Sequence, residues 1–219
     1  MQAIKNHNLY LLHVLFGVLL LVQWPSVEAQ DDSLIKDAQK QQQKLIDKYG
    51  LLEQAQWLRS CENMIQQLSL KHFQQCQILN VDYPNAYSLA HGVVMLTKGL
   101  LENIRNDDQL AHVLAHEHAH LALKHHQQAQ AMVKNPPKLF TKSRIKKFYR
   151  GIEQAADDAA DELLTRNHRD PKQIHHYLIR IAAQIKESSA DHEKLKDRIQ
   201  SKQLPAEKVE LHWTTSPKL

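Results

Sequence analysis

The sequence predicts an α+β fold that is mainly helical, with a small β-sheet beside a histidine-rich helix. Three observations lead to this prediction. The stretch Asp107–His126 is rich in Ala and Leu, and no Pro or Gly occurs between Asn106 and Pro136. Two segments with strand character, Gln74–Val81 and Ala86–Thr97, come before it. Amphipathic helical patterns precede and follow these segments.

Helices are expected where apolar residues recur at three- and four-residue spacing. The segments with this pattern are Asp32–Tyr49, Leu51–Leu70, Asp107–His126, Gly151–Leu164 and Pro171–Ile185. Within Ala86–Thr97, two short strands are expected on either side of His91-Gly92. The sheet then lies immediately before the histidine-rich helix, where an exposed edge strand can hold an extended peptide by strand addition.

The first 29 residues have the pattern of a secretory signal peptide. Lys5 precedes the apolar run Leu9–Val22, and Val27-Glu28-Ala29 fits cleavage after Ala29. An uncleaved membrane anchor is the alternative, although a run of 14 residues, interrupted by His13 and Gly17, is short for a span of about 20. We therefore expect an exported, periplasmic protein whose residues 30–219 form one domain.

Charge and cysteine content narrow the functional classes. The formal net charge of +4 is too small to argue for nucleic-acid binding. Cys61 and Cys76 both fall in the part expected to be exported, where a disulfide between them is favoured over two buried free thiols. The sequence leaves the oligomeric state open.

The motif His116-Glu117-His118-Ala119-His120 is the first indication of chemistry. On a helix, His116 and His120 lie one turn apart, so both imidazoles can bind one zinc ion. Glu117 lies beside them, where it can act on a metal-bound water. The alternative is a histidine-rich helix that is solvated or that buffers several loosely bound zinc ions.

A second indication is a line of carboxylates in Gly151–Leu164. Glu153, Asp157 and Asp161 recur at four-residue spacing on an Ala-rich helix, where they repel one another in water. They form either an exposed acidic face or a metal site. In the second case Glu153 is the third zinc ligand and Asp157 orients a histidine ligand from behind.

Between these two segments lies a basic stretch, Lys134–Arg150, with seven Lys or Arg and no acidic residue. A solvated basic linker is the favoured interpretation of this stretch. The functional alternatives are a mobile lid and a patch for peripheral contact with an anionic membrane surface.

Taken together, these motifs resemble the gluzincin metallopeptidases, which include HtpX, the CAAX prenyl proteases, the mitochondrial Oma peptidases and BepA. The resemblance is strongest over residues 76–199. It rests on Gly92–Leu101, on the motif His116–His120 with His125 behind it, on Glu153–Asp157, and on His192 with Arg198-Ile199. The sequence differs from the family pattern before Gly92 and at Glu193.

The resemblance implies a gluzincin-type domain in a small exported member without the repeat domain of BepA. One zinc ion per chain would be held by His116, His120 and Glu153, with Glu117 as the general base. His192 and Arg198 would support the charged intermediate. The implied function is a zinc endopeptidase for unfolded or misfolded envelope proteins. The alternative is a chaperone-like assembly factor that binds extended clients with latent or little proteolysis.

Overall fold

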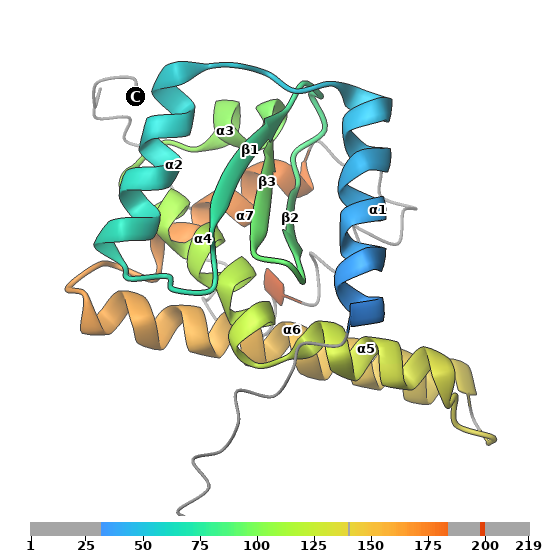
Figure 1. The fold of residues 1–219 in the computed structure, drawn as a ribbon. Helices are drawn as coiled ribbons and strands as arrows, with labels where there is room; N and C mark the ends of the chain where they lie inside the picture. Colours follow the sequence, from blue (N-terminus) through green and yellow to red (C-terminus); the bar gives the residue numbers. More distant parts are fainter. Residues whose placement is uncertain (1–31, 140, 184–197, 200–219) are drawn as a thin grey trace, which may run out of the picture. The chain divides into compact units, whose positions relative to one another are not determined.

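The computed structural model describes residues 32–139, 141–183 and 198–199, which belong to one compact unit beginning at Asp31. In chain order its elements are α1 Asp32–Tyr49, α2 Ala55–Gln67, β1 Gln75–Leu79, β2 Ala86–Leu89, β3 Val93–Thr97, α3 Lys98–Asn103, α4 Asp107–Ala122, α5 His125–Lys134, α6 Thr141–Arg166 and α7 Gln173–Ala182. The expected α+β, mainly helical class is confirmed (Figure 1). None of the described helices is both long and apolar enough to cross a bilayer. The predicted signal peptide and its cleavage site lie outside the described residues.

The sheet has three strands in the order β1-β3-β2, with β1 parallel and β2 antiparallel to β3. All five residues of β3 are buried, as expected of a central strand. The strand β2 is an edge strand, as the sequence predicted. Its residue Ser88 pairs with Val94 and therefore shares the sheet face of Val94.

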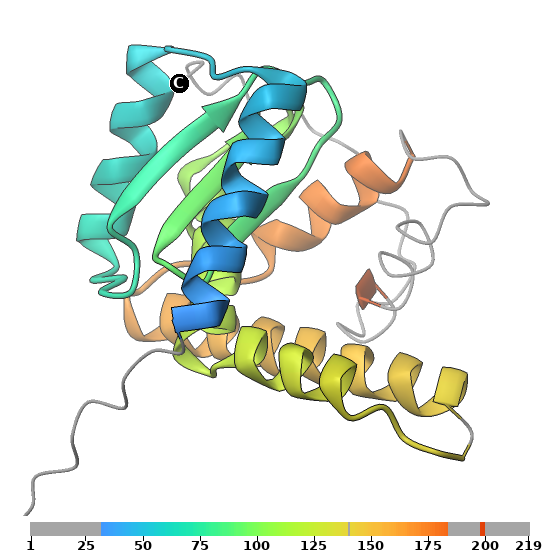
Figure 2. The same ribbon diagram turned by 45° about the vertical axis from the view of Figure 1, so that its right-hand side comes forward.

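Helices cover both faces of the sheet. On one face α1 packs through Leu34 and Ala38 against a cluster that includes Met95. On the other face α2, α4 and α7 form the larger core around Val94 and Leu96. Figure 2 shows α1 in front of the strands and α7 behind them. The helix α4 is thus held between the sheet and the helices α6 and α7.

The pair Cys61 and Cys76 forms a disulfide between α2 and β1, as the cysteine content favoured. Both residues are buried in the larger core. The expected second helix is shorter than Leu51–Leu70, because Leu51 instead forms a bridge with Leu79 and extends the sheet locally. The segment after β3 is also a helix, since the Thr97 side chain accepts a hydrogen bond from the backbone N–H of Leu100 and caps α3.

Further helix predictions are wrong in their limits. The histidine-rich helix was expected to continue through His126, but α4 ends at Ala122 because Lys124 takes a left-handed conformation with φ 55°. The interpretation of Lys134–Arg150 as a linker is also wrong. Only a short loop follows α5, and α6 begins at Thr141 and runs through Gly151 without a break. The helix expected over Pro171–Ile185 begins two residues later, since α7 starts at Gln173.

Candidate metal centre

The helix α4 carries the H-E-x-x-H motif and is fixed at its start by local interactions. The Asn106 side chain accepts a hydrogen bond from the backbone N–H of Gln109, and Asp107 and Asp108 lie in the first turn, near the positive end of the helix dipole. Along the rest of the helix, small buried residues face α6, which presents small buried residues in return. These are Ala115, Ala119, Ala156 and Ala160. Such side chains allow two helices to approach closely.

The helices α4 and α6 run antiparallel and are joined by three contacts between a histidine and a carboxylate, which we call rungs. His112 Nε2 lies 2.8 Å from Asp161 Oδ1, and His116 Nδ1 lies 2.9 Å from Asp157 Oδ1. The third rung joins His120 to Glu153 at 3.9 Å. The carboxylates are therefore not an exposed acidic face. Their four-residue spacing matches that of the histidines on the opposite helix.

One end of this ladder brings three donor atoms of the right kind together. The Nε2 atoms of His116 and His120 are 3.1 Å apart, and Glu153 Oε2 is 3.4 Å from His116 Nε2. The ligand atoms of all three residues lie within 4.8 Å of one another. Zinc bonds of about 2.0–2.2 Å in a tetrahedral site place ligands roughly 3.3 Å apart. Two imidazoles and a carboxylate in this arrangement fit a zinc ion with one position open to a small molecule.

Burial and charge prepare the same residues for a cation. Burial and Arg198 lower the pKa of His116, but the carboxylates of Asp157 and Glu153 outweigh them and raise it to about 9. Burial raises the pKa of Glu153, but the hydrogen bond from His116 and the charges around it bring it down to about 2. Against the effect of burial, Arg198 and His116 likewise hold the pKa of Asp157 well below its usual range. Both carboxylates are consequently ionised at neutral pH, and a cation beside them is stabilised.

Arg198 and Asp157 form a two-point ion pair behind His116. Arg198 Nη2 donates to Asp157 Oδ1 at 2.7 Å and Nε donates to Oδ2 at 3.1 Å. Arg198 also borders the cavity in front of the ligands. The structure thus brings Arg198 to the site, where it holds the carboxylate that orients His116. His192, the other residue expected to support the charged intermediate, lies outside the described residues.

Glu117, the candidate base, is held by the edge strand of the sheet. Its Oε2 accepts hydrogen bonds from the Ser88 backbone N–H at 3.0 Å and from the Ser88 hydroxyl at 2.8 Å. Ser88, which stands 29 residues before Glu117, was not predicted from the sequence. Its place in the edge strand was the only signal that could have drawn attention to it.

Two further histidines were not assigned a role from the sequence. His125 Nδ1 lies 3.0 Å from His120 Nδ1, on the side of that ring opposite the other ligands. On an unbroken helix these positions would be about 140° apart, so the turn at Lys124 is what brings them together. Burial lowers the pKa of His126, against a hydrogen bond to the Ser88 backbone that raises it. The signal for both was the continued run of histidines after the motif.

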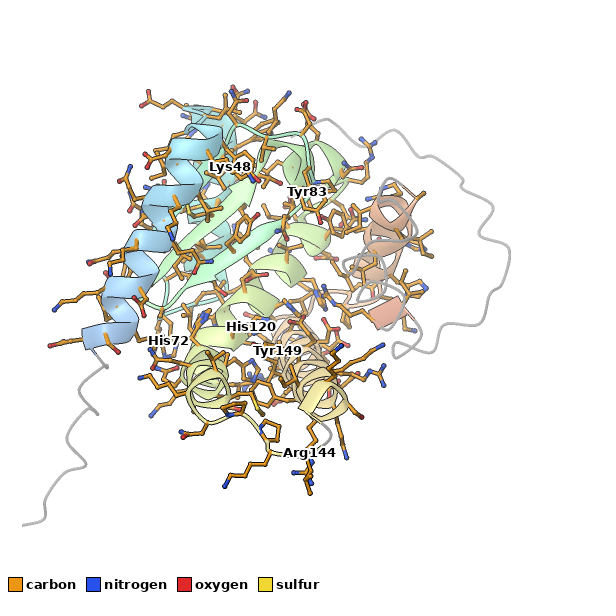
Figure 3. All side chains as sticks on the ribbon, turned by 90° about the vertical axis from the view of Figure 1, so that its right-hand side faces the viewer. Lys48, His72, Tyr83, His120, Arg144 and Tyr149 are labelled. Carbon is orange, nitrogen blue, oxygen red and sulfur yellow. A yellow bond between two sulfur atoms is a disulfide. The ribbon has the colours of Figure 1, made fainter. Side chains whose placement is uncertain are left out.

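A cavity of about 360 Å³ opens in front of these groups. The edge-strand region contributes Tyr83, Tyr87 and Ser88 to its wall, and α7 contributes apolar side chains such as Tyr177. In Figure 3 the labelled His120 lies on α4 between the sheet and the lower helices, and the labelled Tyr83 lies near the end of the strands. The cavity is therefore lined both by the ligand cluster and by β2.

The part of the chain that includes the motif is similar to a known protein family. Residues 52–142 match the family model described as peptidase family M48. No curated protein matches the sequence. The matched segment covers the sheet and α4 and ends in the first turn of α6, so Glu153 and Asp157 lie beyond it.

Proposed function

From the membership of this chain in peptidase family M48, which implies a zinc metallopeptidase, we propose that it is an endopeptidase acting on unfolded proteins of the cell envelope. The observation that carries the proposal is the meeting of His116, His120 and Glu153 at one end of the cavity, with Glu117 beside them. These three residues would hold a zinc ion, which would supply a water molecule with a pKa near neutrality and polarisation of the scissile carbonyl.

In this proposal Glu117 moves the proton. Its Oε2 is occupied by the two hydrogen bonds from Ser88, so Oε1 is the atom that takes the proton from the attacking water and passes it to the leaving amine. The bonds from Ser88 fix the carboxylate in one orientation. A carboxylate held in one orientation is a more effective base than a mobile one, because it does not have to be oriented during the reaction.

The peptide substrate binds in extended form beside β2, where Tyr87 and Ser88 line the cavity. Tyr87 and Leu89 pair with β3, and the backbone N–H of Ser88 points the other way, towards Glu117. An extended chain that adds to this edge lies across the cavity next to the ligand cluster. A binding mode based on backbone groups selects for unfolded segments, which supports a role in protein quality control.

The test is cleavage of casein by the exported protein, run beside Glu117→Gln. We expect the variant to bind one zinc ion per chain, as the wild type does, and to lose cleavage by at least about a hundredfold, the contribution of a general base. The matched control is Glu53→Gln, an exposed position, which should cleave like the wild type. Undiminished cleavage by Glu117→Gln would refute the assignment.

The chaperone-like alternative predicts a different result from the same samples. If neither wild type nor Glu117→Gln cleaves casein but both suppress its aggregation, the protein acts by binding extended clients. The ordered contact between Glu117 and the edge strand favours the peptidase, because client binding by β2 does not need a carboxylate there.

A further inference from the structure

The helix α5 and the first half of α6 form an arm that has no core of its own. We call residues 125–150 the basic arm; Figures 1 and 2 show its two helices running side by side to one end of the molecule. His125, at the base of the arm, is buried, but none of the described residues from His126 to Gly151 is. The next buried residue is Ile152. Packing within the protein therefore does not explain the sequence of the arm.

The charges in the arm are of one sign. From His118 to Ile152 the chain contains eight Lys or Arg and no Asp or Glu. Within α6 the segregation is sharp, since the acidic residues begin at Glu153 and all the basic ones except Arg166, in the last turn, precede it. Basic residues in the first turns of a helix oppose the helix dipole and are unfavourable there. Lys142 and Arg144 occupy this unfavourable position, which indicates an anionic partner.

Exposed aliphatic side chains accompany the charges at the end of the arm. Val133 is 72% exposed and Leu139 is 69% exposed, on the two sides of the Pro136-Pro137 loop. They are the two most exposed large hydrophobic residues of the described chain. In Figure 3 the labelled Arg144 lies at the outer end, on the side away from the sheet. Charge and apolar surface are thus presented together.

We infer that the end of the basic arm docks on the surface of a membrane that contains anionic lipids. Lys and Arg near such a surface each contribute attraction to the headgroups, and aliphatic side chains enter the boundary between headgroups and acyl chains. A nucleic acid would satisfy the positive charges but offers no apolar layer to Val133 and Leu139. Docking in this way holds the cavity close to the bilayer, where envelope proteins are inserted and assembled.

The experiment measures how much of the purified protein, residues 30–219, sediments together with lipid vesicles. The mass of the protein is verified beforehand. One set contains phosphatidylcholine alone, and the other contains equal parts of phosphatidylcholine and phosphatidylglycerol. We expect binding to the anionic vesicles only, weakened by salt. Neutralising four exposed arm residues, with Lys138→Gln, Lys142→Gln, Arg144→Gln and Lys147→Gln together, should weaken binding by at least about a hundredfold.

The matched control removes the same charges from exposed positions elsewhere, with Lys36→Gln, Lys44→Gln, Arg59→Gln and Lys71→Gln. It should retain most of the vesicle binding. The pair Val133→Ser and Leu139→Ser should weaken vesicle binding but not binding to a single-stranded oligonucleotide. Equal loss in the arm variant and the control, equal binding to both kinds of vesicle, or tighter binding to the oligonucleotide than to anionic vesicles would each overturn the inference.

Discussion

At the scale of single residues, the candidate metal centre depends on which nitrogen of each histidine faces the cluster. His116 donates its Nδ1–H to Asp157, so its Nε2 is the atom that binds a cation. His120 directs Nδ1 to His125 and Nε2 to His116. Both rings therefore present the same atom to a metal, and Asp157 and His125 hold them in that orientation.

Removal of Glu153, the third candidate ligand, should weaken zinc binding. Glu153→Ala removes the one ligand that α6 supplies, and two imidazoles on a single helix turn make a much weaker site. We expect zinc affinity to fall by more than about a hundredfold, measured by competition with a chelating dye. Asp158→Ala, an exposed acidic position on the same helix, is the control. Unchanged zinc affinity in Glu153→Ala would exclude it as a ligand.

At the scale of elements, the sequence predicted what is periodic or local. The helix α1, the two short strands and the acidic half of α6 were found because apolar spacing and turn residues mark them. The turn at Lys124 was missed, because a left-handed lysine has no distinctive sequence signal. The bond between Ser88 and Glu117 was missed because it depends on how β2 packs against α4, which spacing along the chain does not reveal.

The rung between His112 and Asp161 should stabilise the packing of α4 against α6. His112 is fully buried and lies one turn from His116, so its bond to Asp161 fixes the register of α4 against α6. A double-mutant cycle with His112→Ala, Asp161→Ala and the double variant should give a coupling free energy of about 1 kcal/mol or more. Chemical denaturation measures it. Additive effects would show that the rung does not stabilise the pair.

At the scale of the whole described unit, the protein combines a tightly packed body with an arm that is not packed. The body holds both core clusters and the ligand residues. The arm carries most of the Lys and Arg residues that lie between His118 and Ile152. The sequence identified the arm by composition but not its helical structure, because a polar segment without an apolar stripe has no periodicity from which a helix can be predicted.

The disulfide belongs to the body, and its removal should lower stability without emptying the metal centre. It joins α2 to β1 with a sequence separation of 15 between the cysteines, and a loop of about that length accounts for about 3 kcal/mol. We expect Cys61→Ala with Cys76→Ala to unfold at lower temperature in thermal denaturation but to bind zinc with wild-type stoichiometry. The ligands lie on α4 and α6, neither of which is part of the bridge.

Thermal denaturation with and without a reductant distinguishes the effect of losing the disulfide from the effect of losing the packing of the two cysteine side chains. Reduction should lower the unfolding temperature of the wild type towards that of the double variant and leave the variant itself unchanged. If reduction leaves the wild type unaffected while the variant is destabilised, the two buried side chains contribute through packing alone. If the variant also loses zinc, α2 and β1 support the metal centre through the shared core, and the body is more cooperative than its separate helix contacts imply.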